Sequence, residues 1–115
     1  MKRGDIYKVN LSPRSGSEQM GTRPAIVISH DAFNQTLNWR SVIVVPVSTS
    51  PSQAKRGPTA VFLPKGSTGL SSDSVALCHQ ITTLDKAKLT RYLGTLSNNL
   101  LEQVECGLKA AMDMV

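Results

Sequence analysis

Short apolar runs and apolar–polar alternation recur through most of the chain, a pattern typical of β-strands. The strongest run is VIVVPV at residues 42–47, and PAIVIS at residues 24–29 is a second. Pro46 within the strongest run requires an edge strand or a bulge there, because proline cannot donate to a β-ladder. Weaker strand patterns occupy residues 5–11, 59–63, 74–77, 80–83 and 92–96. Short strands at such regular spacing predict a small, strongly bent barrel of about five to seven strands.

Two segments have helical features. His30 to Leu37 is consistent with a short helical turn that Asp31 could cap. At the end of the chain the apolar spacing changes to three and four residues, which predicts a helix over about residues 97–115 that closes the barrel. Its apolar stripe is formed by Leu101, Val104, Leu108, Ala111 and Val115. Ser97 or Asn99 can cap this helix, and Gly107 within it costs about 1 kcal/mol relative to alanine.

Length and composition narrow the class of protein. A chain of 115 residues is expected to form one domain, with the barrel at about residues 1–96 and the helix at about residues 97–115. The apolar fraction of 40% and charged fraction of 18% exclude a disordered chain or a coiled coil. The sequence shows no signal peptide and no membrane span, and Cys78 and Cys106 form no C-x-x-C motif. We therefore expect a cytoplasmic protein without a membrane partner.

The charge is unevenly distributed. Thirteen Lys and Arg residues against eight Asp and Glu residues give a net charge of +5. Residues 97–115 carry a net charge of −2, so the first 96 residues carry +7. A basic body favours a polyanionic partner such as nucleic acid, and solubility alone is the competing interpretation.

Two polar loops flank the apolar runs and hold the candidate chemistry. The loop at residues 12–22 precedes Arg23, and the loop at residues 48–58 begins with Ser48. An arginine fork and nearby hydroxyl donors suit a phosphodiester, although loops of this composition are common. No metal-ligand spacing or phosphate-binding glycine loop is present, so we expect no metal and no cofactor. His30 and His79 could form an acid–base pair, but a structural or rim role is the preferred interpretation.

Several motifs occur in an order that identifies a family resemblance. The opening R-G-D-I-Y at residues 3–7 is followed by G-S-E-Q at residues 16–19 and by the Arg23-Pro24 step. Further matches are V-P-V-S-T at residues 45–49, D-S-V-A-L at 73–77, Q-I-T-T-L-D at 80–85 and L-T-R-Y-L-G-T-L at 89–96. In this order they resemble the MazF/PemK family of toxin endoribonucleases over essentially the whole chain.

The resemblance implies a fold and an activity. The fold would be an SH3-like barrel of the CcdB/MazF type that works as a homodimer. The activity would be metal-independent, sequence-selective cleavage of single-stranded RNA, including mRNA. Attack by the 2′-hydroxyl would leave a 2′,3′-cyclic phosphate and a 5′-hydroxyl end. A cognate antitoxin with an acidic, partly disordered tail would block the site.

The resemblance also assigns roles to residues. Arg23 falls on the family's essential arginine, and Ser48 on its essential hydroxyl, where many members have threonine. Glu18 is a possible general base, and His79 replaces an acidic residue that is common at its position, which could alter which bases are accepted. The expected RNA-binding residues are Gln19, Thr49, Lys55, Arg56, His79 and Gln80, of which Lys55 and Arg56 are expected to hold the phosphate backbone.

Two other functions compete with RNA cleavage. A CcdB-like toxin that poisons gyrase resembles this fold, but that group carries a tryptophan at its C-terminal end. The only tryptophan here is Trp39, which disfavours this alternative. A non-catalytic RNA-binding barrel is the second alternative, and the presence of Arg23 together with Ser48 argues against it.

Overall fold

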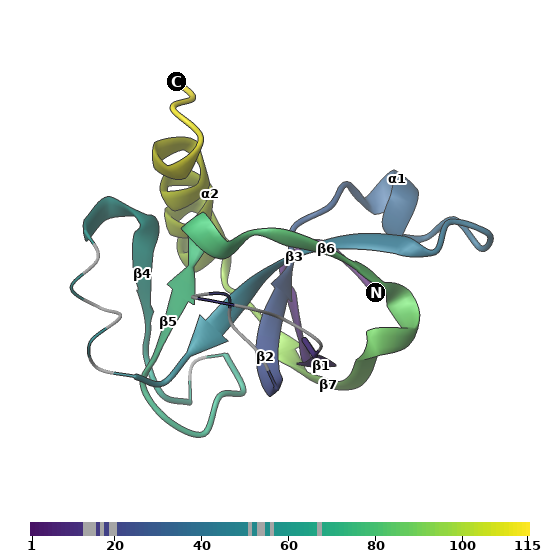
Figure 1. Ribbon diagram of the computed structural model, residues 1–115, viewed down its shortest axis with the longest axis horizontal. Helices are drawn as coiled ribbons and strands as arrows, with labels where there is room; N and C mark the ends of the chain where they lie inside the picture. Colours follow the sequence, from purple (N-terminus) through teal and green to yellow (C-terminus); the bar gives the residue numbers. More distant parts are fainter. Residues whose placement is uncertain are drawn as a thin grey trace.

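The structure is a computed structural model that describes residues 1–12, 16, 18, 21–50, 52, 55, 57–66 and 68–115. The strands are β1 (Asp5–Asn10), β2 (Thr22–Val27), β3 (Ser41–Ser48), β4 (Ala60–Leu63), β5 (Ser74–Leu77), β6 (Thr82–Asp85) and β7 (Leu89–Thr95). The helices are α1 (Asp31–Asn34) and α2 (Asn98–Ala111), with short 3₁₀ turns η2 (Gly57–Thr59), η3 (Cys78–Gln80) and η4 (Lys86–Lys88). The predicted fold class is confirmed: the chain is mainly antiparallel β with a C-terminal helix (Figure 1).

The strands form one bent antiparallel sheet in the order β4-β5-β3-β2-β1-β7, and β6 also pairs with β3. β3 is therefore an interior strand, so the edge position, one of the two alternatives predicted for Pro46, is wrong. β6 pairs with β3 only up to Val44, and β5 pairs with it from Val47 onward. Pro46 lies where the neighbouring strand changes, so its missing N–H leaves no ladder partner unsatisfied on that side.

β4 and β7 stand at the two ends of the strand order, and no hydrogen-bonded ladder joins them in the described residues. The connection from β4 to β5 instead approaches the backbone of β7. A Cβ atom added at Gly69 would clash with the carbonyl oxygen of Leu93, and one added at Gly94 with that of Thr68. Gly69 also has a φ of +78°, which favours glycine. Both glycines therefore allow this close approach of the two backbones.

Both faces of the central strands are buried, which explains their continuous apolar runs. Ile26 and Val45 belong to a core cluster that includes residues of α2. Ala25, Val27 and Val44, on the opposite face, belong to a second cluster. Successive residues of one strand thus pack into different core clusters, because side chains along a strand alternate between the two faces of the sheet.

Helix α2 begins after Ser97, whose side chain accepts a hydrogen bond from the N–H of Leu100 at 3.2 Å. The helix ends at Ala111, before the expected limit at residue 115, and Val115 is fully exposed. Its buried residues are Leu100, Val104, Gly107 and Leu108. They pack on the first core cluster and on η3, so α2 supports the 3₁₀ turn that carries His79 and Gln80.

The short helix α1 is capped by His30, not by Asp31 as predicted. Nδ1 of His30 accepts from the N–H of Ala32 at 2.9 Å. Asp31 instead accepts from the backbone N–H of Arg3 at 2.7 Å, and this bond lowers the pKa of the Asp31 carboxyl. The Arg3 guanidinium in turn reaches Glu105 on α2 at 2.6 Å. These contacts join the start of the chain to both helices.

Candidate functional site

The sheet register places Arg23 and Ser48 next to each other. In the β2–β3 ladder, Ala25 pairs with Pro46 and Val27 with Val44. Continued by two residues beyond Ala25, the same register sets Arg23 opposite Ser48. Directly opposed residues of antiparallel strands point to the same face, with Cβ atoms about 4.5–5.5 Å apart. The extended register thus sets both residues at one end of the sheet, on the face that carries Ala25 and Val44.

The local structure leaves the Ser48 hydroxyl able to donate. Its Oγ accepts a hydrogen bond from the N–H of Ser50 at 3.1 Å, so the hydroxyl proton is available for another acceptor. Ser48 ends β3 and pairs with Val75 of β5. Only 2% of the residue is exposed, whereas Arg23 is half-buried. The serine is thus a largely buried donor beside a more accessible cation.

The turn η3 brings two further predicted residues to β3. This turn joins β5 to β6, and both of these strands pair with β3, so η3 lies beside the part of β3 where its partner changes. His79 is exposed and Gln80 is half-buried on this turn. Their position next to β3 is compatible with contacts to a ligand that lies across the end of the sheet.

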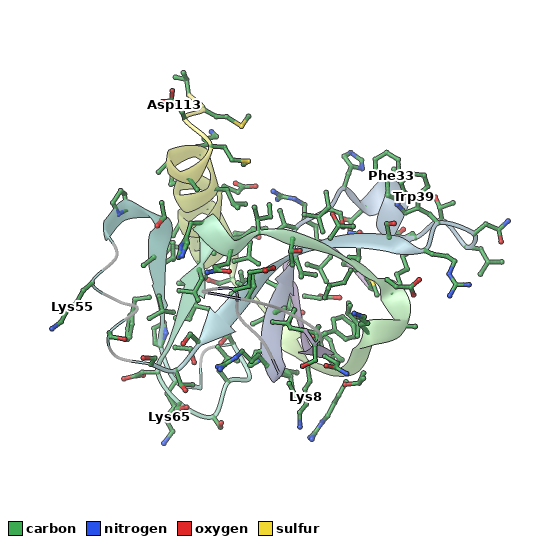
Figure 2. All side chains as sticks on the ribbon, viewed as in Figure 1. Lys8, Phe33, Trp39, Lys55, Lys65 and Asp113 are labelled. Carbon is green, nitrogen blue, oxygen red and sulfur yellow. The ribbon has the colours of Figure 1, made fainter. Side chains whose placement is uncertain are left out.

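The two polar loops supply the remaining predicted residues. Glu18 and Thr49 are exposed, and Thr49 directly follows Ser48. Lys55 is also exposed, but Figure 2 shows it pointing outward from its loop, away from the strands. The structure therefore does not bring Lys55 to the Arg23–Ser48 pair. Gln19 and Arg56 lie outside the described residues.

A hollow of about 410 Å³ adjoins Ser48 on the side of β4 and β5. Its lining residues are Thr49, Ser50, Phe62, Ser72, Asp73, Ser74 and Val75. Phe62 is 54% exposed. It stands in the continuous apolar run A-V-F-L, so no pattern in the sequence distinguishes it from its buried neighbours Val61 and Leu63.

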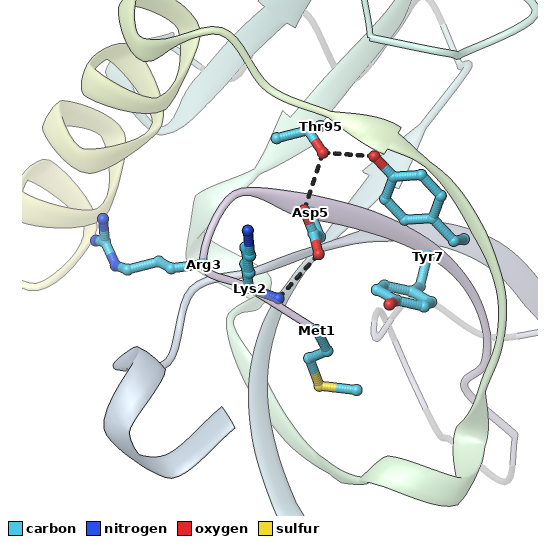
Figure 3. Close-up of a pocket in the computed structure, with 7 residues that line it drawn as sticks. Met1, Lys2, Arg3, Asp5, Tyr7 and Thr95 are labelled. Atoms are coloured by element: carbon cyan, nitrogen blue, oxygen red, sulfur yellow. Dashed lines mark hydrogen bonds between the residues drawn. The ribbon is translucent and has the colours of Figure 1, made fainter. Parts of the chain in front are cut away.

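A second hollow, of about 400 Å³, lies at the N-terminal end of β1 (Figure 3). Asp5 on its wall is 8% exposed and accepts hydrogen bonds from the N–H of Lys2 at 2.8 Å and from Thr95 Oγ1 at 2.9 Å. The Tyr92 hydroxyl lies 2.6 Å from the same Thr95 oxygen. Through Thr95, these contacts link Asp5 of β1 to Tyr92 of β7.

The described part of the chain contains neither a candidate metal site nor a helix that could span a membrane. Within it, His, Cys, Asp and Glu side chains form no group of three that could hold a metal ion. Neither helix there has the length and apolar character needed to cross a membrane. The buried Cys78 thiol donates to the carbonyl oxygen of Val104 at 3.6 Å, and burial raises its pKa to about 11. Cys78 is therefore a packed residue and not a nucleophile.

The chain is similar to proteins of a known family. Residues 2–112 match the family described as PemK-like, MazF-like toxin of type II toxin-antitoxin system. The chain is 35% identical over 115 residues to Endoribonuclease EndoA of Bacillus subtilis, covering 100% of this chain and 97% of that protein.

Two solved structures from Deinococcus radiodurans are also similar. A crystal structure of MazF has a TM-score of 0.81 and 27% identity, and the match covers 99% of this chain and 97% of that one. A MazE-MazF crystal structure contains a chain with a TM-score of 0.75 and 28% identity, where the match covers 100% and 97%.

Proposed function

We propose that this chain, which belongs to the family of PemK-like, MazF-like toxins of type II toxin-antitoxin systems, is an endoribonuclease that cleaves single-stranded RNA. A relative that is 35% identical over the whole of this chain is named an endoribonuclease. The observation that supports the proposal is the β2–β3 register, which pairs Ala25 with Pro46 and, extended by two residues, sets Arg23 opposite Ser48. A fixed cation beside a hydroxyl donor is suited to stabilise charge that develops on a phosphodiester.

The reaction is proposed to use the ribose as its own nucleophile. The 2′-oxygen attacks the adjacent phosphorus and forms the 2′,3′-cyclic phosphate, while the bond from phosphorus to the 5′-oxygen breaks. One proton leaves the 2′-hydroxyl, and one proton is delivered to the departing 5′-oxygen. Arg23 neutralises the non-bridging oxygens and Ser48 donates to the same phosphate. None of these steps requires a metal ion.

Glu18 is proposed as the general base that takes the 2′-hydroxyl proton. It is exposed on the loop that precedes β2, the strand that carries Arg23. Arginine does not suit this role, because its guanidinium stays protonated in proteins and has no acceptor. The small exposure of Ser48 adds a requirement: the segments around it must move for a phosphate to reach its hydroxyl.

The surrounding residues are proposed to bind the RNA strand. Thr49 directly follows β3, and Gln80 is the last residue of η3. An RNA strand that crosses the site would pass both residues. Lys55 is proposed to hold the phosphate backbone farther from the cut, in agreement with its outward position (Figure 2). Gln19 and Arg56 are assigned to the same groove by family resemblance, and His79 is proposed to influence base choice.

The proposed protein partners are a cognate antitoxin with an acidic, partly disordered tail and a second copy of this chain. The family description and the MazE-MazF crystal structure support an antitoxin partner, and the net charge of +5 favours an acidic segment.

An apolar surface near α1 supports a homodimer. Phe33 and Trp39 have ring centroids 5.0 Å apart and are 47% and 46% exposed. With Ile43 they line a hollow of about 330 Å³, and exposed apolar patches of this kind mark partner surfaces (Figure 2). The proposed location of the protein is the cytoplasm.

One experiment tests the activity. The purified protein is incubated with a long single-stranded RNA in excess EDTA, and the 5′ ends of the products are mapped. We expect discrete cuts with 5′-hydroxyl ends. Arg23→Ala should reduce cleavage about 100- to 1,000-fold, the effect of losing one such donor. Arg40→Ala is the matched control, because Arg40 precedes the opposite end of β3 and its side chain is 78% exposed.

The outcomes separate the competing functions. Cleavage by Arg23→Ala at the wild-type rate would overturn the assignment of Arg23. Inhibition of gyrase without RNA cleavage would favour a gyrase-poisoning toxin, and RNA binding without cleavage would favour a non-catalytic barrel.

A further inference from the structure

A row of side chains extends from the Arg23–Ser48 pair to the outer strand of the sheet. Ser48 of β3 pairs with Val75 of β5, and Val75 pairs in turn with Phe62 of β4. Residues that pair directly across strands share a face of the sheet. The same face of the sheet therefore carries Phe62, Val75 and Ser48 side by side. Figure 1 shows the three strands that hold them, β4, β5 and β3, next to one another.

The exposure of Phe62 contrasts with that of its strand neighbours. Val61 and Leu63 are 7% and 0% exposed in the core, whereas the Phe62 ring is directed outward and the residue is 54% exposed. Phe62 is two strands away from Ser48, a distance of roughly 10 Å at the usual strand spacing. An RNA strand whose phosphate lies at Ser48 therefore has a neighbouring nucleotide within reach of the ring.

The hollow beside Phe62 suits a nucleobase better than a phosphate. Asp73 lines it together with several hydroxyl groups, and a carboxylate repels a phosphate. The Asp73 carboxylate accepts from the N–H of Lys65 at 2.8 Å, which fixes its position on the wall. A flat aromatic ring, with polar groups around it, offers stacking for the face of a base and hydrogen-bonding partners for its edge.

We propose that Phe62 is a stacking platform for the base of a nucleotide next to the scissile phosphate, and that the hollow bounded by Phe62 and Asp73 is a base subsite. This inference rests on the proposed function, since it takes the Arg23–Ser48 pair as the position of the cut. Phe62 binds and positions the RNA and takes no part in bond breaking.

The test combines a protein change with a substrate change. A short RNA containing one mapped cleavage site is prepared with an abasic nucleotide at each flanking position in turn. At the position that stacks on Phe62, the abasic change should lower wild-type kcat/KM by about 5- to 150-fold, the range expected for one base–aromatic stack. Phe62→Ala should lower kcat/KM for the intact RNA by a similar factor. In this variant the abasic change should have no further effect at the stacking position, while its effects at the other positions should remain.

Further variants separate stacking from folding. Phe62→Tyr and Phe62→Trp keep an aromatic face and should retain the abasic effect, whereas Phe62→Leu should lose it. Met112→Ala is the matched control, because Met112 is similarly exposed but lies at the C-terminal end of α2. Its sensitivity to abasic changes should equal that of the wild type. Thermal unfolding of each variant shows whether the fold is retained.

The subsite and the proposed activity fail in different ways. If the wild type cuts no RNA, the proposed activity fails. Fluorescence anisotropy on the same RNA carrying a 2′-deoxynucleotide at the cut then still measures binding at the subsite. If the abasic penalties are equal in the wild type and Phe62→Ala at every position, the subsite is overturned while cleavage by the wild type stands.

Discussion

Gly107 of α2 lies directly against Cys78 of η3: a Cβ added at Gly107 would be 2.7 Å from Sγ of Cys78 and 3.0 Å from Cγ2 of Val61. The glycine, which is unfavourable within a helix, is therefore required by the close approach of α2 to the core. This contact also fixes the first residue of the turn that carries His79 and Gln80.

Gly107→Ala should destabilise the protein despite the better helix propensity of alanine. Overpacking of a filled core costs about 1–3 kcal/mol, against a gain of about 1 kcal/mol from the helix. Urea denaturation should show a net loss of up to about 2 kcal/mol in the free energy of unfolding. In a Cys78→Ala background the loss should shrink because Sγ is absent. An unchanged loss there would show that Cys78 is not the obstacle.

Ser48→Ala should lower RNA cleavage by about 100- to 1,000-fold, because a donor to the phosphate is lost. Ser48→Thr keeps the hydroxyl and should remain within about tenfold of the wild type, the added methyl group being the only new demand on packing. Single-turnover cleavage at saturating protein measures both. Equal rates for Ser48→Ala and the wild type would remove Ser48 from the proposed mechanism.

Glu18→Gln should change the pH dependence of cleavage and not only its rate. A general base must be ionised, so wild-type kcat/KM should fall as the pH is lowered and the carboxylate takes up a proton. The variant should have a lower rate and should lose this acidic limb. Glu102→Gln on α2 is a matched control that should keep the wild-type profile. An acidic limb that persists unchanged in Glu18→Gln would exclude Glu18 as the base.

Lys55→Ala should weaken the binding of all RNA sequences alike, because a phosphate contact carries no base information. The slope of the logarithm of the association constant against the logarithm of salt concentration should decrease by about 0.7. Anisotropy titrations on two unrelated single-stranded RNAs measure this slope. Lys109→Ala on α2 serves as the control with the same charge change. Weakening confined to one RNA would instead assign Lys55 to base recognition.

Asp31→Asn should lower stability at neutral pH but not in acid. The N–H of Arg3 lowers the pKa of the Asp31 carboxyl in the folded state, so the ionised form stabilises the fold above its unfolded pKa of about 3.9. This contribution disappears as the pH falls through the folded pKa. Thermal unfolding should therefore show a lower Tm for the variant at pH 7 and equal Tm values near pH 2. A constant difference at all pH values would contradict this explanation.

Local sequence patterns predicted much of the secondary structure because they report burial and period. The runs at residues 24–29 and 42–47 appear as β2 and β3, and the three- and four-residue apolar spacing appears as α2. Ser97 caps α2 as one of the two predicted alternatives. The strand predicted at residues 80–83 begins later in the structure, because Gln80 ends η3 and β6 begins at Thr82. A 3₁₀ turn of three residues is too short to show a periodic spacing of apolar residues in the sequence.

The sequence by itself determined the residue types of the site, their order along the chain and the family. Only the tertiary structure decided which of these residues meet. Sheet register pairs residues far apart in sequence: it aligns Phe62 with Ser48 through Val75 and, when the β2–β3 ladder is extended by two residues, sets Arg23 opposite Ser48. Register also explains why Pro46 is tolerated in an interior strand. Such pairings depend on long-range packing, which a local pattern of apolar and polar residues does not encode.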